Sequence, residues 1–165
     1  CLACRQNRLW PNTIPLEELS MSEGREEREI LALLCEYCDS VDRGDLDGFA
    51  ELFAEGAWGI AGDLAQGTAA VRAVLDNVII YDGTPNTRHL MSNVQIALQE
   101  GDDSAKARCC ITVMQCVPGD FPLQAIFIGT YHDKLHKQDG RWQFSERVIV
   151  PDLVGDMSRH RSDMA

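Results

Sequence analysis

The sequence lacks any long apolar run, and this absence bears first on membranes. No stretch approaches the roughly 20 apolar residues that a transmembrane helix needs. Residues 1–20 mix Arg, Asn, Pro and Glu, so they also lack the apolar core of a signal peptide. We therefore expect no membrane partner and a cytoplasmic location.

Positive charge is also scarce. Lys and Arg number 15 against 26 Asp and Glu, which gives a formal net charge of -11. Nucleic-acid backbones are bound by basic patches, so this balance argues against nucleic acid as a partner. The acidic residues are expected to form an ordinary solvated surface.

Motifs for phosphate, nucleophilic or metal chemistry are missing as well. The chain has no Gly-rich phosphate loop, no GxSxG elbow and no His/Asp set at metal-ligand spacing. Its seven cysteines are scattered, and the CxxC pairs Cys1/Cys4 and Cys35/Cys38 have no accompanying His/Cys set. We expect reduced thiols that pack as small hydrophobes, and neither a metal nor an organic cofactor.

What the chain does contain is typical of one globular domain. Its 165 residues are 45% apolar and 25% charged. Residues 1–21 show no sustained periodicity and are expected to form a poorly structured leader. The domain is expected over residues 22–158, followed by a polar tail at 159–165.

Three helices are predicted in the first half of the chain. Ser22 is expected to cap the first, which carries an apolar stripe over residues 30–41 and ends at Gly44. Asp45 is expected to cap a second helix, and Thr68 a third.

Strand patterns dominate the rest. The predicted strands are Trp58–Ala61, His89–Leu98, Ala105–Val117, Leu123–Leu135 and Trp142–Val150. This order, with helices first and an antiparallel meander after them, is typical of the α+β class. A curved sheet that wraps around those helices leaves a hollow, which is the natural place for a ligand.

Three stretches resemble a known family. They are YCDSVDRGDLDG at 37–48 followed by Leu52-Phe53, TRHLMSN at 87–93, and GTYHDKL at 129–135 followed by DGRWQF at 139–144 and Arg147. In this order they are similar to SnoaL-like proteins of the nuclear transport factor 2-like (NTF2-like) superfamily. The closest motifs are those of the scytalone dehydratase, dehydrochlorinase and polyketide cyclase-like branch.

The resemblance implies a fold and a candidate pair of residues. The fold would be an α+β cone, in which three N-terminal helices pack in a strongly curved, mostly antiparallel sheet that encloses a pocket. The superfamily includes enzymes and transport factors, so the fold cannot choose between them. In the dehydratase and dehydrochlorinase branch, an Asp on the first helix orients a His base on a strand, which by motif position gives Asp42 and His89.

The residues themselves favour Asp42 as an inward carboxylate. At 100° per residue it falls at the edge of the apolar arc, between Leu31 and Cys35. A buried carboxylate is costly unless it is paired. The partner could be His89, or Asp42 could instead cap the nearby helix turn.

His89 begins an alternating strand. We expect it to share a pocket-facing side with Met91 and Asn93, while Leu90 and its alternating neighbours take the other side. A neutral imidazole is a competent base near pH 7, and a carboxylate on its other nitrogen fixes the tautomer. The other histidines (His132, His136 and His160) are assigned to the opposite face, a turn and the tail.

Four further residues are candidates for the pocket lining. Tyr37, Trp58 and Tyr131 could contact a substrate or simply pack in the core. Arg147 could bind an anion or a carbonyl, or lie on the surface of its strand. No counterpart is evident for the tyrosines that hold the substrate carbonyl in the dehydratases.

The sequence thus supports two functions. The first is a cofactor-independent lyase, isomerase or cyclase acting on a small, largely apolar molecule, with His89 as general base. The alternative is a non-catalytic small-molecule-binding module of the same fold. A homodimer is expected through the outer face of the sheet, since Ala105–Val117 and Leu123–Leu135 carry apolar residues on both faces.

Overall fold

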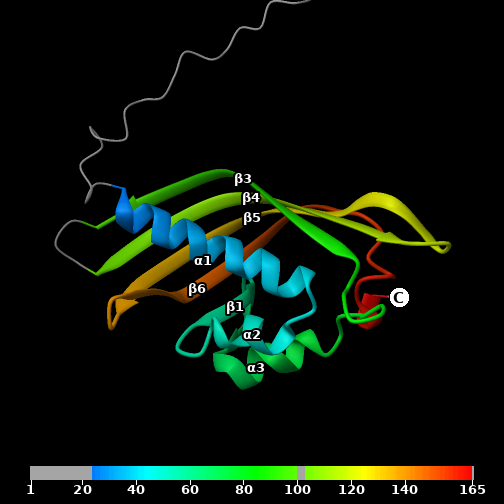
Figure 1. Cartoon of the computed structure of the whole chain (residues 1–165), viewed down its shortest axis with the longest axis horizontal. Coiled ribbons are helices and arrows are strands. Elements are labelled where there is room, and N and C mark those ends of the chain that lie inside the picture. Colours follow the sequence, from blue (N-terminus) through cyan, green and yellow to red (C-terminus); the bar gives the residue numbers. More distant parts are fainter. Residues whose placement is uncertain (1–23, 100–102, 165) are drawn as a thin grey trace, which may run out of the picture.

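The computed structural model describes residues 24–99 and 103–164. In this part of the chain, helices and strands follow the expected order, helices first and a long meander after (Figure 1). The helices are α1 (Arg25–Asp42), α2 (Leu46–Glu51), α3 (Gly67–Leu75) and a short 3-10 helix, η1 (Ser162–Met164). The strands are β1 (Ala57–Ile60), β2 (Asp63–Gln66), β3 (Thr87–Leu98), β4 (Ser104–Val117), β5 (Phe121–Gln138) and β6 (Arg141–Val154).

The described strands form one mixed sheet in the order β2-β1-β6-β5-β4-β3. Every neighbouring pair is antiparallel except β1 and β6, which run parallel. Figure 1 shows α1 lying along one face of this sheet, with α2 and α3 beside β1. The predicted α+β class, with helices against a mostly antiparallel sheet, is confirmed.

Helix α1 packs on the sheet through the predicted stripe. Ile30, Leu34, Tyr37, Cys38 and Val41 are all buried, because they recur at helical spacing on one side. The helix begins after Gly24, a left-handed N-cap residue, whereas Ser22 lies outside the described residues.

The two shorter helices differ in how well their caps were predicted. Asp45 caps α2 as expected, because its side chain accepts a hydrogen bond of 2.9 Å from the Gly48 N–H. The expected cap at Thr68 is wrong, because α3 already begins at Gly67 with Gln66 as its N-cap. Strand β2 was not predicted, since its residues Asp63–Gln66 show neither an alternation nor an apolar run.

The chain leaves α1 through a position that only glycine fits. Gly44 has φ +80°, and a Cβ there would lie 2.2 Å from the carbonyl oxygen of Gly83. This close approach holds the loop around residues 81–84 against the C-terminal end of α1, where Asp42 lies.

The sheet has a buried inner face and an outer face turned away from α1. Along β4 the odd-numbered residues from Ala105 to Val117 are buried, while the even-numbered ones are exposed or partly exposed. The inner face packs against α1 and α2 through Tyr37, Phe49 and Phe53. Polar side chains that project from the inner face are therefore removed from water.

The segment expected to be a polar tail is hydrogen-bonded to the body of the domain. The Ile79 N–H donates to the His160 carbonyl at 2.9 Å, and the Gln115 side chain donates to the Arg159 carbonyl at 2.8 Å. Tyr81 Oη also donates to that Arg159 carbonyl, at 2.7 Å. These bonds bring His160 into the interior.

Within the described residues, no helix is long and apolar enough to cross a membrane.

Candidate active site

Asp42 and His89 meet at the inner face, where the last turn of α1 reaches the start of β3. Nδ1 of His89 lies 2.7 Å from Oδ1 of Asp42. The Asp42 side chain is 1% exposed and that of His89 is 8% exposed. The contact is therefore shielded from water, which strengthens it relative to a surface pair.

Two further donors fix the Asp42 carboxylate. The backbone N–H of His89 donates to Oδ2 at 2.8 Å, and the Thr87 hydroxyl donates to Oδ1 at 2.8 Å. Burial alone would raise the pKa of Asp42, but these hydrogen bonds and the His89 ring hold that pKa below its usual value. The carboxylate is therefore ionised at neutral pH.

An ionised carboxylate decides which nitrogen of His89 carries the proton. Because Asp42 can only accept, Nδ1 of His89 must be the donor of the 2.7 Å bond. In the neutral ring the lone pair is then on Nε2, on the side away from Asp42. This is the arrangement that a histidine general base requires.

A second histidine lies near this pair. His160 is 9% exposed, and its Nδ1 is buried without a hydrogen-bond partner among the described residues. Burial lowers the pKa of His160 to about 4, and the charge of His89 adds to this effect while that of Asp42 opposes it. His160 is thus a neutral imidazole within electrostatic range of both residues.

A second polar cluster lies further along the inner face. Nε and Nη2 of Arg147 each donate a bond of 2.7 Å to Asp133, and both side chains are fully buried. The guanidinium carbon of Arg147 lies 4.0 Å from the ring centre of Tyr37 and 4.5 Å from that of Tyr131. Stacking over aromatic faces gives a buried guanidinium favourable contacts that water would otherwise supply.

The cluster is bound together by aromatic polar groups. Trp58 Nε1 donates to the Tyr37 hydroxyl at 3.0 Å, and the Tyr37 hydroxyl lies 3.5 Å from that of Tyr131. Burial raises the pKa of both tyrosines, so both remain protonated. Arg147 stays charged, since Asp133 outweighs the effect of burial and raises the pKa of Arg147. Its Nη1 is buried with no hydrogen-bond partner in the described part of the chain.

The model of the SnoaL-like domain family matches residues 22–148. The chain belongs to the SnoaL-like domain family. A search of the curated proteins finds no match.

Solved structures similar to this SnoaL-like domain share its fold. A variant of Rv3472 from Mycobacterium tuberculosis, a protein of unknown function, is 28% identical, with a TM-score of 0.65 over 78% of this chain and 73% of that one. An NTF2-like protein with a cystatin-like fold from Novosphingobium aromaticivorans is 24% identical, with a TM-score of 0.61 over 74% and 79%. A candidate scytalone dehydratase from the same organism is 23% identical, with a TM-score of 0.65 over 79% and 87%.

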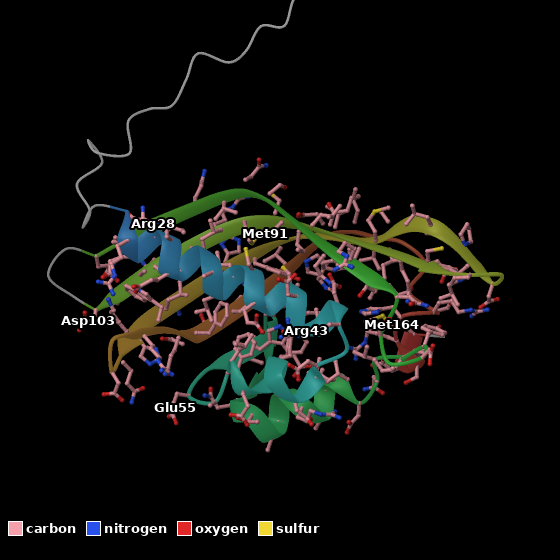
Figure 2. The ribbon with its side chains drawn as sticks, viewed as in Figure 1. Arg28, Arg43, Glu55, Met91, Asp103 and Met164 are labelled. Carbon is pink, nitrogen blue, oxygen red and sulfur yellow. The ribbon has the colours of Figure 1, made fainter. Side chains whose placement is uncertain are left out.

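Six of the eight residues predicted for the site lie in two clusters, and Met91 and Asn93 lie in neither. Asp42 and His89 are in contact, while Tyr37, Trp58, Tyr131 and Arg147 form the second cluster. Met91 is partly buried and packs on the core from β3, on the side of the sheet that carries α1 (Figure 2). Asn93 belongs to neither cluster.

The prediction that Asn93 faces the pocket is wrong. The register of β3 against β4 shifts between Ser92 and Gln95, and Asn93 has φ +51° at this bulge. Its exposed side chain turns to the outer face, where Nδ2 lies 3.8 Å from Sγ of Cys110. Leu90, Val94 and Ile96 were expected on one side of the strand, but the bulge separates them. Leu90 is exposed, whereas Val94 and Ile96 pack on the core.

Sequence reasoning missed the burial of His160, because this residue was assigned to a polar tail. Nothing in the residues around it signals burial, since its burial depends on bonds to residues 79 and 115, which are distant in sequence. No group of three or more His, Cys, Asp or Glu in the described residues is arranged to hold a metal ion.

Proposed function

We propose that this SnoaL-like domain is a cofactor-independent lyase, isomerase or cyclase that removes a proton from a small, largely apolar substrate. The observation that carries the proposal is the 2.7 Å contact between His89 Nδ1 and the buried, ionised Asp42. It leaves Nε2 of His89 as the base. Similarity to a candidate scytalone dehydratase supports the lyase class.

The proposed reaction begins when Nε2 of His89 takes a proton from a carbon next to a carbonyl or a leaving group. The ring then becomes an imidazolium, which Asp42 stabilises through the bond to Nδ1. The carboxylate is held by Thr87 and by the backbone N–H of His89, so it need not reorganise during the step.

His160 would serve the same step in a different role. A neutral imidazole can donate a hydrogen bond to an oxygen on which negative charge develops. The low pKa of His160, about 4, keeps its ring from taking up the proton itself. His89 would thus act as the base and His160 as the hydrogen-bond donor.

The lining proposed for the substrate is apolar with a few polar groups. Met91 supplies an apolar surface next to His89 on the same strand. Tyr37, Trp58 and Tyr131 supply aromatic edges and hydroxyl or N–H groups further along the inner face, and the unpartnered Nη1 of Arg147 is a donor for a carbonyl or an anion. This mixture fits a small hydrophobic molecule with one polar end.

The test is proton exchange, which requires no knowledge of the natural product. The wild type is incubated in D₂O with a panel of apolar ketones and β-hydroxy ketones, and deuterium incorporation is measured by mass spectrometry. We expect incorporation into at least one compound, reduced about 10²- to 10⁴-fold in His89→Ala. Asp42→Asn should also reduce it, because the amide no longer fixes the tautomer of His89.

The matched control is His136→Gln, since His136 binds Ser145 on another part of the sheet. It should leave the exchange rate unchanged. Equal rates in His89→Ala and wild type would contradict base catalysis by His89. A loss of folding in His89→Ala, measured as a lower thermal midpoint with Asp42→Asn affected alike, would assign the pair a structural role.

The alternative is a binding module of the same fold. It would bind its ligand through the same apolar inner face, which carries Phe49, Phe53 and Phe144, without transferring a proton. Such a module would bind an apolar ligand equally well in wild type and His89→Ala, with no exchange in either protein.

A further inference from the structure

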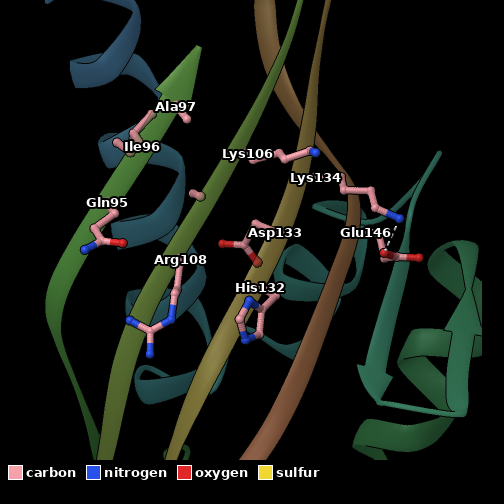
Figure 3. A pocket seen from close by; sticks show the side chains of 10 residues that line it. Gln95, Ile96, Ala97, Lys106, Arg108, His132, Asp133, Lys134 and Glu146 are labelled. Atoms are coloured by element: carbon pink, nitrogen blue, oxygen red, sulfur yellow. Dashed lines mark ion pairs between the residues drawn. The ribbon is translucent and has the colours of Figure 1, made fainter. Parts of the chain in front are cut away.

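The outer face of the sheet carries a hollow that the proposed chemistry does not use. Its volume is about 400 Å³, within the range of small-molecule sites. Figure 3 shows the side chains around it, with α1 on the far side of the strands. We call it the outer hollow, and its polar lining residues are Gln95, Lys106, Arg108, His132, Asp133, Lys134 and Glu146. Of these, Asp133 is fully buried and already paired with Arg147 on the inner face.

The strand register places like charges opposite one another in the outer hollow. Lys106 on β4 lies directly opposite Lys134 on β5, and Arg108 lies opposite His132. Opposed cations on neighbouring strands are destabilising. The Lys106–Lys134 pair therefore lowers the stability of the fold relative to a pair with one neutral member.

Carboxylates within the chain compensate only part of this charge. Glu146 lies opposite Lys134 on β6 and pairs with it at 2.8 Å. Among the described residues, neither Lys106 nor Arg108 has an ion-pair partner.

Other surface arginines of the protein do find carboxylates. Arg43 pairs with Glu36, and Arg72 pairs with Asp47. In a chain with a net charge of -11, acidic partners are abundant. Arg28 and Arg141 also have no ion-pair partner among the described residues, but Lys106 and Arg108 lie together beside one hollow, where they focus positive potential.

We propose that the outer hollow binds a small oxyanion carrying at least two negative charges, of the phosphoryl or polycarboxylate type. Lys106 and Arg108 are two residues apart on the same face of β4, so their stems lie about 7 Å from each other. The guanidinium of Arg108 can bind phosphate or carboxylate oxygens in a bidentate manner. Gln95, opposite Arg108 on β3, adds a neutral donor.

The test uses inorganic pyrophosphate and citrate as probes, each against potassium chloride at matched ionic strength. Binding is measured by isothermal titration calorimetry and by the thermal midpoint. We expect at least one probe to bind wild type and raise its midpoint. Arg108→Gln should weaken binding at least about tenfold, the scale of one lost charged hydrogen bond, and Lys106→Gln should also weaken it.

The matched control is Arg141→Gln, which removes an exposed arginine outside the outer hollow. It should bind the probe as wild type does, as should His89→Ala, because the outer hollow is independent of the proposed base. Without a probe, Lys106→Gln should be at least as stable as wild type, since the like-charge pair with Lys134 is relieved.

Pyrophosphate binding alone would identify a phosphoryl ligand, and citrate binding alone a polycarboxylate. Equal effects of the probe on wild type, Arg108→Gln and Arg141→Gln would overturn the proposal, as would no binding of either probe. If Arg108→Gln instead changes the sedimentation coefficient, the outer hollow belongs to an interface between two copies, and the proposal is also wrong.

Discussion

The two faces of the sheet differ in how their charged side chains are paired. On the inner face, Arg147 and Asp133 are fully buried and joined by two bonds of 2.7 Å. On the outer face, Lys106 and Lys134 lie opposite each other in contact with water. A buried charge must find a partner within the chain, whereas an exposed charge such as that of Lys106 can stay unpaired because water solvates it.

The contact between Asp42 and His89 follows the rule of the inner face. Both Asp42 oxygens accept hydrogen bonds, and the pair is closed to water. The pairing therefore holds the His89 ring in one orientation.

The largest expected effect breaks a buried pair. Asp133→Ala leaves Arg147 charged and uncompensated in the interior, and it should lower the free energy of unfolding by about 3–5 kcal/mol. Glu146→Gln, which removes the carboxylate next to the exposed Lys134, is the outer-face control and should cost about 0.2–1 kcal/mol. Both values come from urea unfolding followed by circular dichroism.

The double variant Asp133→Leu with Arg147→Met sharpens this comparison. Replacing both members of a buried ion pair by apolar residues is often nearly neutral, so much of the lost stability should return. Similar losses in Asp133→Ala and Glu146→Gln would show that burial does not distinguish the two faces.

A smaller effect is expected from His160. Its pKa of about 4 lies below the ordinary value of 6.5, so the unfolded chain binds a proton that the folded chain refuses. The stability of wild type should therefore fall as pH decreases from 6.5 towards 4, with His160 contributing up to about 1.4 kcal/mol per pH unit. His160→Gln should show a shallower fall between pH 6.5 and pH 5, measured by urea unfolding. Identical slopes would mean that His160 is not held neutral by burial.

Much of the fold could be predicted because its signals are local. The apolar stripe of α1, the Asp45 cap and the alternation of β4 each depend on residues within one element. The inward placement of Asp42 was also predicted, although the reasoning was partly wrong. Leu31 and Cys35, which flank Asp42 on the helical wheel, are exposed. A wheel ignores position along the axis, and only the end of α1 is enclosed by β3 and the loop near Gly83.

The rest depends on contacts between distant residues. A bulge reverses the faces of β3, so strict alternation placed Asn93 on the wrong side. His160 is buried only because its segment binds residues 79 and 115. The homodimer through the outer face stays a prediction, since the apolar part of that face (Met114 and Ile128) is partly exposed in the single chain.

The protonation state of the His89 ring is the most direct test of the proposed base. Nitrogen-15 NMR of the histidine side chains at neutral pH reports which ring nitrogen carries the proton. For wild type we predict that Nδ1 carries a proton, bound to Asp42, and that the neutral form of the ring has its lone pair on Nε2. In Asp42→Asn this preference should disappear. A proton on Nε2 in wild type, or no change in Asp42→Asn, would contradict the claim that Asp42 orients His89 as a base.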